Sequence, residues 1–577
     1  MKTQLLKPFG LTAALLSAGM PAFAAVSPCA DTPLQKEAEC ADYQGKLESL
    51  AGQSGTGCVN MTENSDYINF TFDVEAAGKY KVYVAVNGAY GKKTFNCAVN
   101  GTNNSITGGG VTEEVEVGSF KLKAGENTVN ITPAWTWVPV DYVRIEADNA
   151  EAVPFQLSAV PVTPGATDAA KQLYTFLVNN FGSKTISGIM LGDMTTASQG
   201  VKKHEDVQAV VKSSGKYPAL IGVDFMNATG QSASSGNSWF LDYTRSSVEL
   251  AKETWQLGGI PTFTWHWRNP NKDTDGFYMP SANSETNTTF DFTTAFKPGT
   301  TEWDVTSEPY KNMVADIDVI ADYFLELQEA GVAGIFRPLH EASGGWFWWG
   351  TQGGEAYQQL YRLVFDEMVK VKGVKNLIWV WNPATVADID WNPGEEYYDV
   401  HSIDIYNDAF DYSSNASAFN KLKNNVNAKK LIALSENGPI PDIEKQVDEE
   451  AMWSWWMPWY NSWGGDFVTG KTSSDEWTKV MNDERIITLE DMPGWNATSA
   501  TIVNEDKAVE VYPTKVSNYF IVDADNANVV VVDAAGRVVE NKSVNGVSTI
   551  TTAGWSNGVY FVTVTSANGV KTYKLVK

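Results

Sequence analysis

Histidine and cysteine are both scarce in this chain, with four of each among 577 residues. No HExxH segment and no CxxC pair occurs, so the spacings that usually hold zinc are missing. Within residues 165–495 no GxSxG segment occurs either, so the nucleophile elbow of many serine hydrolases is missing there. These absences argue against the commonest metal and serine chemistries and direct attention to other residue types.

Basic residues are few, with 43 Lys and Arg against 69 Asp and Glu, which gives a formal net charge of −26. Binding of nucleic acid requires a basic surface, so we expect no nucleic-acid partner. A hydrophobic fraction of 43% with 19% charged residues is typical of folded domains rather than disorder. The length predicts about three or four domains.

Long apolar runs are also missing, except near the start of the chain. Lys2 and Lys7 precede an apolar stretch over Phe9–Met20, and Ala22-Phe23-Ala24 has the small-x-small pattern of a cleavage site. Residues 1–24 therefore read as a secretory signal peptide removed near Ala24, and the stretch is too short to span a bilayer. We expect a bacterial protein that is secreted or attached to the cell surface, without a membrane span.

The four cysteines, Cys29, Cys40, Cys58 and Cys97, all lie within the first hundred residues. An even count in an exported protein favours two disulfides, for which three pairings are possible. Free buried thiols are the alternative.

Aromatic residues, in contrast, are abundant: the chain has 21 Trp, 23 Tyr and 25 Phe. Eighteen of the tryptophans lie between Trp239 and Trp495. Part of this excess fills the core, but flat aromatic faces also suit sugar rings and other extended ligands.

The patterning divides the chain into three units joined by a linker at 151–164. Residues 27–150 and 501–577 alternate in strand fashion between Gly- and Asn-rich turns and predict two all-β sandwiches. Residues 165–495 alternate apolar runs with helical periods, as over 168–181 and 311–331.

Eight short apolar runs in the central unit predict a (β/α)₈ TIM barrel, with a doubly wound open sheet as the alternative. No GxGxxG follows the first run, which weighs against that alternative. The predicted strands are Thr185–Met190, Ala219–Phe225, Ile260–His266, Ala333–His340, Asn376–Trp381, Ser402–Tyr406, Leu431–Glu436 and Met452–Trp459.

Reactive groups of such barrels lie where the strands end. Glu341 follows the fourth predicted strand and Glu436 ends the seventh, 95 residues later, which corresponds to three βα units of about 32 residues. Two carboxyl groups facing each other in an aromatic cleft are what cleavage of a glycosidic bond requires. Both could instead be structural carboxylates.

Neighbouring residues suggest a role for each glutamate. Glu341 precedes a run of Trp and Phe, which would raise its pKa and suit a general acid. Glu436 lies between the polar residues Ser435 and Asn437 and suits the nucleophile. Asp224 is a third acid in range, expected to support the site by hydrogen bonds.

Two histidines belong to the same strand ends. His266 and His340 with Glu341 could in principle bind zinc, but their spacing matches no common zinc motif. We expect His340 to tune the acid or position Glu436, and His266 to bind a sugar hydroxyl.

The segment Arg337-Pro-Leu-His-Glu-Ala-Ser-Gly-Gly-Trp-Phe-Trp-Trp349 closely resembles the acid/base segment of glycoside hydrolase family 26, which consists mainly of endo-β-1,4-mannanases. Three further blocks match that family in order: Lys216–Phe225, Trp265–Pro270 and Ala433–Gly438. Asn437 stands where many members have an aromatic residue.

The resemblance implies a retaining mechanism with Glu341 as general acid/base and Glu436 as nucleophile, and no cofactor for catalysis. It also implies that the reacting sugar is lined by His266, His340, Trp346 and Tyr406. We add two residues at strand ends to the expected substrate contacts, Trp267 and Trp459.

The first unit resembles a carbohydrate-binding module of family 35, through Glu37-Ala-Glu39, Val99–Gly101, Ala124–Thr128 and Val140–Val143. That resemblance implies a structural calcium bound by Glu37, Glu39 and Asp141, whose oxygens suit a hard cation. Trp135 and Trp137 precede the last strand and are candidates for stacking on a sugar, although one of them could instead fill the core.

The third unit resembles the C-terminal sorting domain of the type IX secretion system, through Val511-Tyr-Pro513, Asp533–Arg537 and Asn557–Val562. The resemblance implies the type IX machinery as a partner. A second small binding sandwich is the alternative.

The sequence therefore predicts a secreted endo-β-1,4-mannanase that acts as a monomer on β-mannan polysaccharides. A mixed-linkage β-glucanase or a β-xylanase on the same fold is the nearest alternative, because these motifs position the chemistry without selecting the sugar. A non-catalytic polysaccharide-binding protein is the alternative of another class.

Overall fold

The computed structural model describes residues 29, 31–149, 153–283, 285–495, 510–512, 519–566 and 569–577. The predicted signal peptide at 1–24 and the start of the predicted linker lie outside these residues. The chain forms two compact units, one up to Trp495 and one from Asn496 onward.

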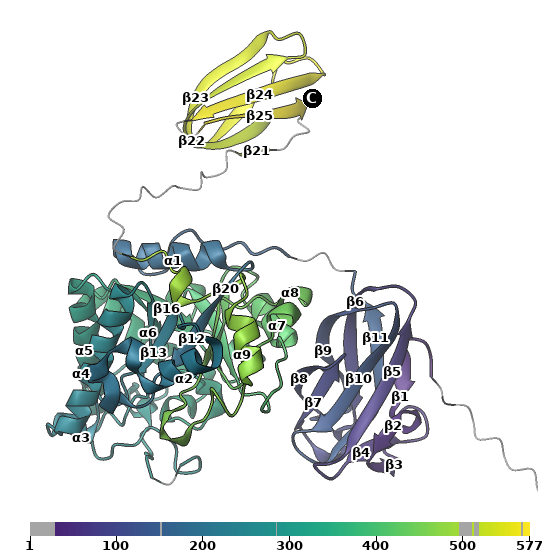
Figure 1. Cartoon of the computed structure of the whole chain (residues 1–577), viewed down its shortest axis with the longest axis vertical. Helices are drawn as coiled ribbons and strands as arrows, with labels where there is room; N and C mark the ends of the chain where they lie inside the picture. The colour runs from purple at the N-terminus through teal and green to yellow at the C-terminus, as the bar shows by residue number, and fades with distance from the viewer. Residues whose placement is uncertain are drawn as a thin grey trace, which may run out of the picture. The chain divides into compact units, whose positions relative to one another are not determined.

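The N-terminal part of the first unit consists of two antiparallel sheets (Figure 1). Side chains alternate along the strands, so that Ile68, Phe70, Phe72 and Val74 all point into one core. One sheet contains β1 (Gln35–Glu37), β3 (Lys46–Glu48), β4 (Cys58–Met61), β6 (Gly78–Val86), β9 (Glu113–Leu122) and β11 (Val138–Ala147). The other contains β2 (Asp42–Gln44), β5 (Tyr67–Val74), β7 (Lys93–Val99), β8 (Thr102–Gly108) and β10 (Gly125–Pro133).

The structure corrects the prediction of two disulfides. Cys29 and Cys40 are joined, but Cys58 and Cys97 are buried free thiols. Cys58 lies on β4 and Cys97 on β7, in different sheets, and the nearest polar partner of the Cys58 thiol is Asp141 at 3.7 Å. Burial raises the pKa of both thiols to about 12, so both behave as small apolar side chains in the core.

The central region is a closed barrel of eight parallel strands, as predicted, and each predicted apolar run overlaps one of them. β12 pairs with both β13 and β19, which closes the sheet and excludes the open alternative. The barrel strands are β12 (Thr185–Met190), β13 (Leu220–Asp224), β14 (Ile260–Thr264), β15 (Gly334–Arg337), β16 (Leu377–Trp381), β17 (Val400–Ile405), β18 (Leu431–Asn437) and β19 (Trp455–Pro458). The short β20 (Ile486–Ile487) pairs with β12 outside this ring.

Helices surround the barrel and contribute apolar faces to a continuous core (Figure 1). In the longest of them, Met313, Ile317, Ile320, Phe324 and Leu327 recur at helical spacing and are all buried. The helices are α1 (Asp168–Asn180), α2 (Glu205–Ser214), α3 (Gln231–Ser234), α4 (Ser238–Gln256), α5 (Glu308–Glu329), α6 (Gly354–Asp366), α7 (Ala416–Asn425), α8 (Ile443–Asp448) and α9 (Ser474–Met481).

The second compact unit, which contains the C-terminal sandwich expected from the sequence, is an antiparallel β structure whose core includes Phe520, Val529, Val531 and Val562. Its described strands are β21 (Glu510–Tyr512), β22 (Tyr519–Asp533), β23 (Val538–Thr551), β24 (Val559–Ser566) and β25 (Gly569–Val576). In the part of the chain that the structure describes, no helix is long and apolar enough to cross a membrane.

Candidate active site

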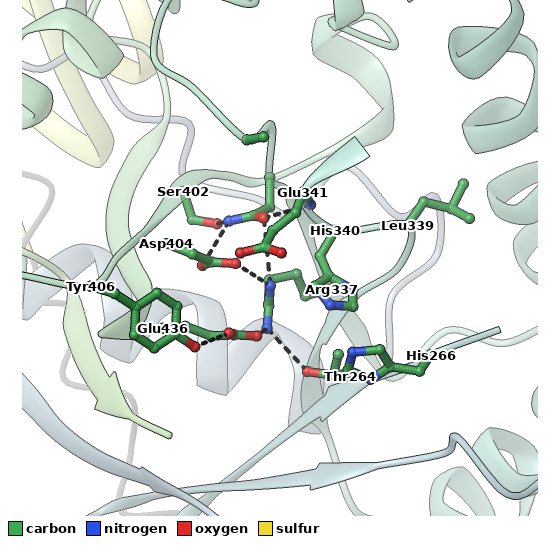
Figure 2. A network of polar contacts seen from close by, with 12 residues as sticks. Thr264, His266, Arg337, Leu339, His340, Glu341, Ser402, Asp404, Tyr406 and Glu436 are labelled. Carbon is green, nitrogen blue, oxygen red and sulfur yellow. Dashed lines mark hydrogen bonds and ion pairs between the residues drawn. The ribbon is translucent and has the colours of Figure 1, made fainter. Parts of the chain in front are cut away.

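Two glutamates and an aspartate meet at the carboxyl ends of three barrel strands (Figure 2). Glu341 follows β15, Asp404 lies near the end of β17 and Glu436 near the end of β18. One carboxylate oxygen from each lies within 4.8 Å of the others. Carboxyl groups about 5 Å apart are typical of retaining glycosidases, because an inverting enzyme needs a wider gap to hold water.

Glu436 is buried and both of its carboxylate oxygens accept a hydrogen bond. Arg337 forms an ion pair with Oε1, and the Tyr406 hydroxyl donates to Oε2 at 2.5 Å. Both partners are donors, so the group is held as a hydrogen-bond acceptor with a fixed orientation.

Glu341 has a different setting. Its backbone is left-handed, with φ of 50°, and its amide donates to the side-chain oxygen of Asn382 at 3.0 Å. The carboxylate accepts one hydrogen bond of 2.9 Å, from Nε1 of Trp346. Burial and the negative charge of Glu436 raise the pKa of Glu341 to about 7, so it holds a proton near neutral pH.

A buried polar network, which the sequence reasoning did not foresee, connects the strand ends (Figure 2). Arg337 lies between two acids and donates to Asp404 at 2.7 Å as well as binding Glu436. Asn382 donates to Asp404 at 3.0 Å and to Ser402 at 3.0 Å. Burial raises the pKa of Asp404, against the opposing effect of Arg337. The available signal was the presence of Arg337 and Asp404 at the ends of otherwise apolar strands.

Both predicted histidines face this network. His266 Nδ1 lies 2.5 Å from Asp224 Oδ2, so Asp224 supports the site as expected, and the His266 ring lies 4.6 Å from that of His340. Burial lowers the pKa of His340 well below the usual value, which keeps the ring neutral. Its Nδ1 is buried without a hydrogen-bond partner in the described part of the chain, which suits contact with a ligand hydroxyl.

The potential metal ligands do not support a His–Glu zinc site. Within the described ranges, the one group of three close ligand atoms is Glu341, Asp404 and Glu436, without a histidine. Arg337 contacts two of the three acids and balances their charge.

The predicted aromatic contacts divide into two groups. Trp346 and Trp459 are half-buried beside the site, and Tyr406 is 46% exposed. Trp267, expected to contact substrate, is fully buried instead: its ring stacks on Trp265 at 4.2 Å and its Nε1 donates to Asp316 on α5. Both residues follow the end of β14: His266 contacts Asp224 and His340 on the side of the site, whereas Trp267 packs against α5.

The family model for glycosyl hydrolase family 26 matches residues 162–491, which includes every strand of the barrel. The chain belongs to glycosyl hydrolase family 26. Models for carbohydrate binding module family 35 and for a secretion system C-terminal sorting domain match residues 34–148 and 510–577. All three resemblances found in the sequence are thereby confirmed.

Relatives of this family 26 chain include a mannan endo-1,4-beta-mannosidase of Thermothelomyces thermophilus, 32% identical over 80% of this chain and 90% of the relative. Mannan endo-1,4-beta-mannosidase B of a Piromyces species is 30% identical over 78% of this chain and 75% of its own.

Two crystal structures are similar. A Podospora anserina GH26-CBM35 beta-(1,4)-mannanase aligns with a TM-score of 0.53 and 28% identity, over 80% of this chain and 99% of its own. A beta-mannanase from a symbiotic protist of the termite Reticulitermes speratus, complexed with a gluco-manno-oligosaccharide, aligns with a TM-score of 0.52 and 39% identity. The alignment covers 59% of this chain and 99% of that structure's chain.

The three predicted calcium ligands of the N-terminal sandwich lie around Ser54 and Gly55, with their ligand atoms farther apart than the 4.8 Å of the barrel acids. The side chain of Ser54 donates to Glu37 at 2.6 Å and its amide to Asp141 at 2.8 Å. Glu39 Oε2 is buried without a partner in the described part of the chain, and a Cβ built on Gly55 would meet Glu39 Oε1 at 2.1 Å. An orphan carboxylate oxygen in a cradle that admits no side chain fits a hard cation such as Ca²⁺.

Trp135 and Trp137 lie on the surface of the same sandwich and do not fill its core. They are 67% and 44% exposed, and Trp137 has a left-handed backbone with φ of 67°. Together with Asn64 and Lys93 they line an open cavity of about 430 Å³.

Proposed function

We propose that this chain is a secreted, retaining endo-β-1,4-mannanase in which Glu341 is the general acid/base and Glu436 is the nucleophile. The observation that carries the assignment is the close approach of the two carboxylates with opposite partners: donors around Glu436, and burial with a raised pKa at Glu341. The named activities of the relatives supply the choice of mannan.

In the first step the carboxyl group of Glu341 gives its proton to the glycosidic oxygen while Glu436 attacks the anomeric carbon. The bond between that carbon and the leaving oxygen breaks, its electron pair goes to the oxygen, and a glycosyl ester of Glu436 forms. Arg337 and Tyr406 orient the nucleophile for this attack.

In the second step Glu341, now a carboxylate, takes a proton from water, and the water oxygen attacks the same carbon. The ester bond breaks and its electron pair returns to Glu436. Two inversions at one carbon retain the anomeric configuration. Neutral His340, with an unpaired buried nitrogen, and His266, fixed by Asp224, are placed to bind sugar hydroxyls.

Hydrolysis of linear mannan, galactomannan, glucomannan, barley β-glucan and xylan tests the substrate. We expect reducing ends and a spread of oligosaccharides from the mannans, and a β-anomer as the first product by NMR. Release from β-glucan or xylan without release from mannan would contradict the choice of sugar. An α-anomer would contradict the assigned chemistry.

In the N-terminal sandwich, we propose that Trp135 and Trp137 stack on sugar rings of the polysaccharide. Large exposed tryptophans beside a polar cavity are suited to a carbohydrate ligand. Replacing both by Ala should weaken retention of the intact protein on insoluble mannan and leave turnover of soluble oligosaccharides unchanged. Unchanged retention would contradict the proposal.

The same sandwich is proposed to bind calcium through Glu37, Glu39 and Asp141. Calcium should raise the melting temperature of chelator-treated protein, and Mg²⁺ should act more weakly because it demands a tighter octahedral site. Glu39→Gln should abolish the calcium-dependent shift, whereas the exposed Glu126→Gln should retain it. A Glu39→Gln variant with the full calcium shift would contradict this site.

The protein is secreted or attached to the cell surface, and we propose the type IX secretion machinery as the partner of the region 510–577. Mass spectrometry of the protein from its native host should show processing of this region. We also propose a monomer, which light scattering of the purified protein tests.

A further inference from the structure

A line of aromatic rings continues beyond the active site. The ring of Trp459, 6.3 Å from that of His266, is 5.4 Å from Tyr460, and Tyr460 is 6.0 Å from Trp463. Trp463 stacks at 6.4 Å on Tyr243, whose ring is 5.7 Å from Trp239 on α4.

The two outer tryptophans of this line are exposed. Trp463 is 53% and Trp239 49% accessible to solvent, while Tyr243 between them is buried and supports both. Exposed indole rings leave apolar surface in contact with water, and a ligand that covers the rings removes this unfavourable contact. We call Trp239, Tyr243 and Trp463 the outer aromatic platform.

The backbone at Trp463 is strained, with φ of 51° in the left-handed region. A bulky residue adopts this conformation rarely, and such strain persists only where the surrounding structure enforces it.

Asp206, at the start of α2, binds the segment that immediately precedes Trp463. Its fully buried carboxylate accepts from the amides of Asn461 and Ser462, at 2.7 Å each, and from the amide of Gly192 at 2.9 Å. Tyr243 donates to the carbonyl of Gly192 at 3.3 Å. The loops after β12 and β19 are therefore fixed to the platform before any ligand arrives, which lowers the entropic cost of binding.

We propose that the outer aromatic platform is a distal binding site for the same β-1,4-mannan chain that occupies the active site. The rings of Trp463 and Trp239 stack on sugar residues several positions from the bond that is cleaved, and Trp459 and Tyr460 bridge the distance. The site favours long chains over short oligosaccharides. This inference rests on the proposed function of the barrel.

The double variant Trp239→Ala/Trp463→Ala tests the platform against wild type, with mannotetraose as a short substrate and mannohexaose and soluble linear mannan as long ones. We expect kcat/KM on the long substrates to fall about tenfold, mainly through KM, because about 1.4 kcal/mol of stacking corresponds to that factor. On mannotetraose kcat/KM should stay unchanged. Leu241→Ala, which removes an exposed apolar side chain from the same helix, should match wild type on all substrates.

Several outcomes would overturn the proposal. An equal loss on short and long substrates would indicate damage to the active site, and no loss on any soluble substrate would leave the platform without a role in chain binding. With insoluble mannan assayed in parallel, a loss confined to that substrate would identify a surface anchor that is separate from the cleft. Failure of the wild type to cleave any β-mannan would instead refute the proposed function and is distinguishable from all three.

Discussion

The ends of β15 and β18 present the same residue type to the same cleft, yet the two glutamates have opposite surroundings. Glu436 contacts a guanidinium and a phenol, both of them hydrogen-bond donors. The carboxylate of Glu341 receives a single indole N–H and lies within 4.8 Å of two other carboxylates. The surroundings therefore assign the role of acid to Glu341 and the role of nucleophile to Glu436, although the two side chains are identical.

The division also depends on the distance between the two groups. The charge of Glu436 contributes to the raised pKa of Glu341, second only to burial, while Arg337 opposes the rise. The charge of Glu436 and the protonation of Glu341 are therefore linked, and a change at Glu436 should be felt as a change in the pKa of Glu341. Four substitutions test this relation, in order of expected effect.

Replacing Glu436 by Gln removes the nucleophile and should have the largest effect. We expect kcat on mannan to fall by roughly 10⁴-fold or more, because no glycosyl ester can form. The same change removes a negative charge, so the pKa of Glu341 should fall below about 7, which carbon NMR of labelled glutamate can follow. A variant that keeps substantial turnover would contradict the nucleophile assignment.

Replacing Glu341 by Gln should lower kcat/KM on mannan by about 10²–10⁴-fold, the usual range for a general acid. With an aryl mannobioside whose phenol leaves without protonation, formation of the ester should be nearly as fast as in wild type and its hydrolysis slow. A pre-steady-state burst of phenol would show this imbalance. Equal losses with both leaving groups would indicate that Glu341 is not the acid.

The positions of the two glutamates can be predicted from the sequence, because the patterns that place them lie in short continuous segments. The apolar runs fix the eight strands, and strand ends of a barrel converge, so Glu341 and Glu436 can be placed together without a structure. The pKa of Glu341 is raised, as expected, but through burial and the charge of Glu436, while Trp346 in the aromatic run after it lowers this pKa by a hydrogen bond.

The remainder depends on contacts between distant segments. The pairing of Arg337 with Asp404 and Glu436 requires the register of β15, β17 and β18, which no single segment encodes. The burial of Trp267 is not evident from its motif, because adjacent residues of one segment contact different parts of the barrel: His266 contacts Asp224, and Trp267 contacts Asp316 of α5. The pairing of the cysteines likewise depends on which sheet each strand joins.

Replacing Asp404 by Asn tests whether the nucleophile side depends on its buried network. The amide can still accept from Asn382, but it no longer balances the charge of Arg337, which loses an ionic hydrogen bond of 2.7 Å. We expect kcat to fall about 10- to 100-fold with a smaller change in KM, because Glu436 loses its fixed orientation. A Ser402→Ala variant, which removes a more remote member of the network, should lose less. An effect on melting temperature alone would assign Asp404 a purely structural role.

Replacing Trp346 by Phe tests the acid side and should have the smallest effect. The acid works only while protonated, so kcat/KM of the wild type should decline as the pH rises through about 7, the pKa of Glu341. The Trp346 N–H stabilises the charged carboxylate and lowers that pKa; without it the pKa rises, and the alkaline limb should move to higher pH by up to about one unit. Trp349→Phe is the matched control, because that indole donates to the carbonyl of His340 at 2.9 Å instead of to the acid. A shift of the alkaline limb toward lower pH in Trp346→Phe, or an equal shift in the control, would show that the single indole bond does not set the acid apart from the nucleophile.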